Sequence, residues 1–82
     1  LVGQRIARTM LRLMRRAGKK TEEGVRIDIP LSRQNIADYC GTTLYTASRT
    51  LSVWEKRGWI KSRREQITIT DPNAIMIFAE KE

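Results

Sequence analysis

Residues 32–60 read SRQNIADYCGTTLYTASRTLSVWEKRGWI, and this stretch decides the fold. Ser32 and Thr43 are favourable N-cap residues, so the sequence predicts one helix over about 33–39 and a second over about 44–57. Gly41 lies between them and tolerates the left-handed backbone that a tight turn requires. Ala37 is small enough to let two helices cross closely. The stretch therefore predicts a helix-turn-helix over residues 32–57.

Regular structure is also predicted before this motif. Apolar residues recur at helical spacing from Ile6 to Ala17, which predicts an amphipathic helix over residues 3–17 that Gly18 ends as a C-cap. Residues 19–26 (KKTEEGVR) are polar and are predicted to form a loop. Residues 27–30 alternate between apolar and polar side chains, as in a short strand that Pro30 ends.

A β-hairpin is predicted after the motif, with strands over residues 59–63 and 66–70 and a polar tip at residues 63–66. Asp71 and Pro72 then start a last helix over about 72–80. This helix is expected to pack Ile75, Ile77 or Phe78 on the body. The order predicts a mainly α fold with a small β-hairpin wing, a winged helix-turn-helix, as a single domain over residues 1–82.

The composition narrows the possible functions. Sixteen Lys and Arg against nine Asp and Glu give a formal charge of +7, which favours an anionic partner. The chain has no histidine and a single cysteine, which argues against a structural zinc site, an intrachain disulfide and a Ser-His or Cys-His nucleophile pair. No apolar run approaches the ~20 residues of a membrane-spanning helix. We therefore expect neither an enzyme nor a membrane protein.

The first helix is strongly basic, since the first twenty residues carry seven positive charges and no negative one. Its arginines lie mostly opposite the apolar face. They form either a surface that faces DNA or a membrane, or an ordinary solvated helix face. Long-range attraction to a polyanion follows in both cases.

The outer face of the second motif helix carries groups that can read bases. We expect Tyr45, Ser48, Arg49 and Ser52 to project there, with Arg49 as the best candidate for a bidentate contact to guanine. The alternative for Arg49 is a surface salt bridge to Glu55 or Asp38. Ser48 is alternatively a small solvent-facing residue, and Tyr45 one that rests on its own protein.

Other residues are placed to hold phosphate. Thr43 and Thr46 lie at the start of the second motif helix, where free N–H groups and the helix dipole favour an anion, although Thr43 is alternatively only a cap. Arg33 starts the preceding helix, and Arg63 and Arg64 lie at the hairpin tip. Such contacts position a domain without reading sequence.

Cys40 has two interpretations. A redox role needs an exposed, electropositive setting. Its place among the apolar positions of the first motif helix instead favours a small buried hydrophobic residue.

The combination of R-Q-x-I-A-x-x-x-G at residues 33–41 with T-x-S-R-x-L at residues 46–51 resembles the C-terminal DNA-binding domain of the Crp/Fnr family of bacterial transcription regulators. The resemblance covers nearly the whole chain. It implies that Arg49 reads a guanine, that Ser48 contacts a base, and that Arg33, Thr43 and Thr46 contact phosphates. Two residues depart from the family pattern: Tyr45 stands where many members carry a base-reading glutamate, and Glu65 where many carry a wing glycine.

The resemblance also implies a cytoplasmic protein with further parts. Members carry an N-terminal sensor domain and a dimerisation helix, so we expect the chain to be a piece of a longer regulator that binds palindromic double-stranded DNA as a homodimer. It implies no cofactor in this domain, since any effector or cluster binds the sensor. It places loop 19–26 where some members contact RNA polymerase.

Other functions compete with sequence-specific DNA binding. Some winged helices are protein–protein interaction modules, which are expected to lack the arginine and hydroxyl groups that this chain keeps on its second motif helix. Non-specific binding of RNA or of an anionic membrane is another. Readers of RNA sequence usually show stacking aromatic residues on a sheet, and here the hairpin offers only Trp59.

Overall fold

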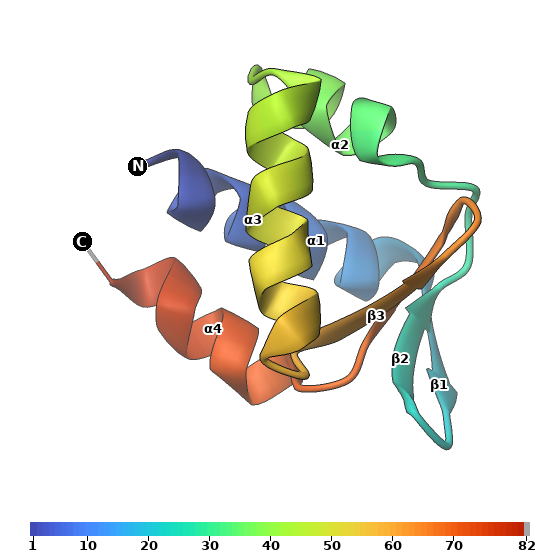
Figure 1. The fold of residues 1–82 in the computed structure, drawn as a ribbon. Coiled ribbons are helices and arrows are strands. Elements are labelled where there is room, and N and C mark those ends of the chain that lie inside the picture. Colours follow the sequence, from blue (N-terminus) through green and yellow to red (C-terminus); the bar gives the residue numbers. More distant parts are fainter. Residues whose placement is uncertain (82) are drawn as a thin grey trace.

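The computed structural model describes residues 1–81 and contains four helices and one small antiparallel sheet (Figure 1). The helices are α1 (Val2–Ala17), α2 (Arg33–Cys40), α3 (Leu44–Lys56) and α4 (Pro72–Glu80). The strands are β1 (Gly18–Thr21), β2 (Gly24–Ile27), β3 (Ile60–Arg63) and β4 (Gln66–Ile69). The winged helix-turn-helix prediction is confirmed, and helix bounds agree to within one residue.

The sheet is larger than the sequence predicted. Its strand order is β1-β2-β4-β3, with every neighbouring pair antiparallel. The expected loop over residues 19–26 is wrong, because most of it forms β1, a two-residue turn and β2. The expected strand over residues 27–30 is also wrong, since β2 ends at Ile27 and the segment to Ser32 is irregular.

Long-range pairing explains this difference. In β2, Val25 pairs with Ile69 and Arg26 with Thr68, so β4 supplies backbone partners that the polar sequence of the hairpin does not reveal. Gly24 permits the close approach, because its φ is 148° and a Cβ there would lie 2.2 Å from the carbonyl oxygen of Ile69. Gly18 is the C-cap of α1, as predicted; its backbone is extended (φ −79°) and begins β1 directly.

The hydrophobic core lies between α1, α2, α3, α4 and the inner face of the sheet. Trp54 of α3 is buried there, and its ring lies 6.1 Å from that of Trp59 and 5.8 Å from that of Phe78. Ile75 of α4 is fully buried, whereas Ile77 is 61% exposed, so α4 docks through Ile75 and Phe78. Burial of this kind stabilises the fold by about 25 cal/mol per Å² of apolar surface removed from water.

In Figure 1, α3 crosses in front of α1 and leaves its outer side uncovered, with the β3–β4 wing beside it. Within residues 1–81, no helix is long and apolar enough to cross a membrane. The fold thus leaves one face of α3 open to solvent and packs its opposite face against the core.

Candidate nucleic-acid interface

The turn between α2 and α3 is fixed by backbone hydrogen bonds. Gly41 adopts the left-handed conformation (φ 66°), and its N–H donates to the carbonyl of Asp38 at 3.3 Å. Thr42 N–H donates to the carbonyl of Ala37 at 2.9 Å. Ala37 is fully buried, as the close crossing of the two helices requires. The roles predicted for Ala37 and Gly41 are therefore confirmed.

Capping hydroxyl groups define the start of α2 and of α3. Thr43 Oγ1 accepts the N–H of Thr46 at 3.1 Å and donates to Thr46 Oγ1 at 3.1 Å. Ser32 and Asn35 cap α2 reciprocally, each side chain accepting the other's backbone N–H at 3.0 Å. Thr43 is exposed and Thr46 is half-buried. Thr43 is therefore a cap, and a cap of this kind is compatible with a phosphate contact.

The outward face of α3 lies opposite its buried residues. Ala47, Leu51 and Trp54 point into the core. At 100° per residue, Tyr45 and Arg49 lie on the other side of the helix, and both are exposed. Two shallow hollows flank the row formed by Tyr45, Arg49 and Val53. This face of α3 is therefore open to solvent.

Tyr45 and Arg49 interact across one helical turn. Arg49 Nη1 donates to the hydroxyl of Tyr45 at 3.2 Å, and the guanidinium carbon lies 5.6 Å from the centre of the tyrosine ring. Within residues 1–81, Arg49 forms no ion pair with Glu55 or Asp38. The salt-bridge alternative for Arg49 is therefore wrong. Asp38 instead accepts from Gln34 at 2.9 Å.

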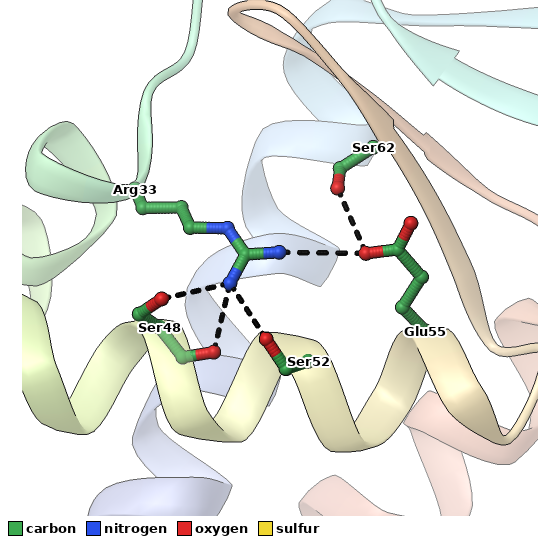
Figure 2. Close-up of polar contacts among 5 residues, drawn as sticks. All are labelled: Arg33, Ser48, Ser52, Glu55 and Ser62. Atoms are coloured by element: carbon green, nitrogen blue, oxygen red, sulfur yellow. Dashed lines mark hydrogen bonds and ion pairs between the residues drawn. The ribbon is translucent and has the colours of Figure 1, made fainter.

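Arg33 lies across α3, as Figure 2 shows. Its Nη1 donates to the carbonyl oxygen of Ser48 at 2.8 Å, to Ser48 Oγ at 2.8 Å and to Ser52 Oγ at 2.9 Å. Its Nη2 lies 3.4 Å from Glu55 Oε1, which also accepts from Ser62 Oγ of β3 at 3.0 Å. One guanidinium thus joins α2 to α3, and Glu55 joins α3 to the wing.

This network differs from what was predicted for Ser48 and Ser52, which were expected to project from the outer face of α3. Ser48 and Ser52 do not project freely outward, because both hydroxyl oxygens accept from Arg33. Each hydroxyl keeps its own hydrogen to donate elsewhere. The phosphate contact expected of Arg33 and the base contact expected of Ser48 stay predictions. Sequence reasoning missed the roles of Glu55 and Ser62, since neither lies near Arg33 in the chain.

The wing presents basic side chains at its tip. Arg63 and Arg64 are both exposed, and Glu65 adopts a positive φ of 51°. A non-glycine residue in this left-handed conformation is strained. The Glu65 carbonyl accepts the N–H of Leu31 at 2.8 Å, which ties the tip to the segment before α2.

One ion pair steadies the other end of the sheet. Lys61 Nζ lies 2.5 Å from Glu23 Oε2, linking β3 to the β1–β2 turn. A hydrogen bond from Lys61 and the charges of Lys61 and Arg63 hold the pKa of Glu23 below its ordinary value of 4.5. Both partners are half exposed, so the pair contributes little to stability in ordinary salt.

Cys40 is buried, and its Sγ donates to Thr9 Oγ1 at 3.3 Å. The interpretation of Cys40 as a small buried residue is confirmed. Within residues 1–81, no group of three or more cysteine and acidic side chains could hold a metal ion.

Comparison with known proteins agrees with this architecture. The family model for the Crp-like helix-turn-helix domain matches residues 4–76. The global nitrogen regulator of Synechocystis sp. is 34% identical over 74 residues, which cover 90% of this chain and 33% of that protein. The nitrogen fixation regulation protein FixK of Azorhizobium caulinodans is 37% identical over 76 residues, covering 88% of this chain and 30% of that protein.

Solved structures show the same fold. The CO-dependent transcription factor CooA from Carboxydothermus hydrogenoformans superimposes with a TM-score of 0.89 at 23% identity, over 95% of this chain and 36% of that one. The fold and the α3 face define a winged helix-turn-helix domain. The chain belongs to the Crp-like helix-turn-helix family of the Crp/Fnr transcription regulators. It spans about a third of the length of the curated relatives named above.

Proposed function

We propose that the chain binds double-stranded DNA in a sequence-specific manner, as the output domain of a Crp/Fnr-type transcription regulator, with α3 in the major groove. The observation that carries the proposal is the outward face of α3, where Arg49 is exposed opposite the core and next to hydroxyl groups. Arg49 reads a guanine by donating to O6 and N7. Ser48, whose oxygen already accepts from Arg33, donates its hydroxyl hydrogen to a base acceptor.

Phosphate contacts would surround this helix. Thr43 and Thr46 lie at the N-terminus of α3, where the helix dipole favours an anion. Arg63 and Arg64 at the wing tip reach the flanking backbone, together with the Arg33 donors that α3 leaves free. These groups fix the register of the domain and carry most of its salt dependence.

The wider assembly is part of the proposal. Two copies would place their α3 helices about 34–36 Å apart on a palindromic site, as expected of a homodimer. RNA polymerase is proposed to contact the β1–β2 hairpin, whose turn exposes Glu22 and Glu23. The relatives extend well beyond the matched region, so we place the binding of any effector or cofactor outside this domain. We propose a cytoplasmic location and no catalytic activity.

A salt series on a panel of duplexes tests the proposal, with Arg49→Ala and Arg63→Ala variants beside the unmodified chain. Arg49→Ala should flatten the preference among duplexes, because the guanine contact is worth about 1–3 kcal/mol of discrimination. Arg63→Ala should weaken all duplexes alike and reduce the salt slope by about 1. If no duplex binds above background, the protein–protein module becomes the better interpretation. If duplexes bind but neither variant matters, the assigned contacts are wrong.

A further inference from the structure

The outward face of α3 carries no carboxylate that is free to accept a hydrogen bond from a base. Glu55 is the only acidic residue between Leu44 and Lys56. Its Oε1 accepts from Ser62 and pairs with Arg33, on the side toward the wing. The hydroxyl oxygens of Ser48 and Ser52 accept from Arg33. A carboxylate is the usual acceptor for the amino group of cytosine, so this face lacks the means to select that group.

What the face offers instead is an aromatic ring beside a guanidinium. Tyr45 is 68% exposed, and its hydroxyl accepts from Arg49 Nη1 at 3.2 Å. The guanidinium of Arg49 lies 5.6 Å from the ring centre. The ring also borders a shallow hollow lined by Tyr45, Arg49 and Val53 among others. In the major groove, the thymine C5-methyl is the group that an apolar side chain recognises.

The spacing brings the two contacts onto neighbouring base pairs. Tyr45 and Arg49 are one turn apart, which is about 6 Å along the helix axis. Base pairs follow each other every ~3.4 Å, so a side chain one turn away reaches one or two steps along the duplex. Tyr45 is the second residue of α3, and the N-terminal residues of a recognition helix are those that contact base edges.

We propose that Tyr45 is a specificity-determining residue that selects thymine, through its C5-methyl group, within two base pairs of the guanine read by Arg49. Tyr45 also positions Arg49, since its hydroxyl and ring hold the guanidinium along the outward face. The inference rests on the proposed function and adds the chemistry of one further base pair to it.

The test begins with selection of duplexes from a random pool by the immobilised chain. The guanine read by Arg49 is the position whose preference is lost with Arg49→Ala. Each thymine within two base pairs is then replaced by uracil, which removes only the methyl group. We expect one replacement to weaken binding about fourfold, or about 0.8 kcal/mol for one buried methyl-sized group.

Variants assign that effect to Tyr45. Tyr45→Ala should bind the thymine and uracil duplexes equally, and Tyr45→Phe should keep the distinction while loosening the guanine preference. Tyr45→Glu should shift the selected base toward one that presents an amino group. Tyr39→Ala removes another exposed tyrosine, on α2, and should change neither preference. Because Tyr45 is exposed, these variants should melt at the temperature of the unmodified chain.

These measurements distinguish a failure of thymine selection by Tyr45 from a failure of sequence-specific DNA binding. The inference is overturned if selection returns an Arg49-dependent guanine with no thymine nearby, or if uracil costs the same in Tyr45→Ala as in the unmodified chain. In both cases sequence-specific binding still stands. If selection enriches no sequence and Arg49→Ala changes nothing, the proposed function fails and the inference fails with it.

Discussion

Arg33 joins α2 to α3 through its guanidinium group, and replacing it should destabilise the domain. Its side chain is 29% exposed and its Nη1 donates to three acceptors on α3. A net hydrogen bond contributes about 0.5–1.5 kcal/mol, and the lower end applies at a partly exposed site. Arg33→Met should therefore lower the free energy of unfolding by about 1.5 kcal/mol. The ion pair with Glu55 adds little, since Glu55 is 40% exposed.

Thermal unfolding measured by circular dichroism checks this value. A loss of that size lowers the melting temperature of a domain this small by roughly 6–12 °C. Arg33→Lys keeps the charge but not the planar fork of donors, so it should recover only part of the loss. Arg12→Met, on the exposed side of α1, is the matched control and should melt within a few degrees of the unmodified chain. Melting of Arg33→Met at the unmodified temperature would refute the idea that Arg33 holds α3.

Three further changes have defined outcomes. Glu65→Gly should raise the melting temperature by roughly 4–8 °C, because it relieves about 1 kcal/mol of left-handed strain, and an unchanged melting temperature would contradict this. The lowered pKa of Glu23 means that its pairing with Lys61 gives a small stabilisation above about pH 4.5, which is lost as the pH falls through the folded-state value. Glu23→Gln should therefore flatten the acid side of the stability profile slightly at low salt, and an equally steep profile would count against the pair. Cys40 should react with a thiol reagent only after denaturant is added, whereas rapid labelling of the native chain would contradict its burial.

Much of the fold could be predicted from the sequence because its signals are local. Ser32, Thr43 and Asp71 cap α2, α3 and α4 at the predicted starts. Gly41 adopts the predicted left-handed turn. Each signal depends only on residues three or four positions apart, which is the range that helix periodicity and capping cover.

The β1–β2 hairpin could not be predicted in this way. All four residues of β1 are exposed. The half-buried β2 is ordered by β4, some 40 residues later in the chain by the pairing of Val25 with Ile69. Gly24 was the one local signal, because its conformation permits β2 to approach β4 closely. A glycine between polar residues equally describes a loop.

The candidate site was predictable as a set of residues and not as a network. The exposure of Tyr45 and Arg49 follows from helix periodicity alone. The reach of Arg33 to Ser48 and Ser52 depends on the angle at which α2 crosses α3, and this angle has no signature in the spacing of residues. For the same reason, the contacts of Glu55 with Arg33 and with Ser62 could not be predicted from the sequence.

In the proposed complex, α3 is the surface that contacts DNA. The most direct measurement is a titration of the ¹⁵N-labelled chain with a selected duplex, followed by amide and guanidinium resonances. DNA binding through α3 predicts that the largest shifts fall on Tyr45, Arg49 and the turn before α3, with smaller shifts at the wing tip and almost none along the arginines of α1. Shifts concentrated on α1 or α4, with Arg49 unaffected, would contradict it.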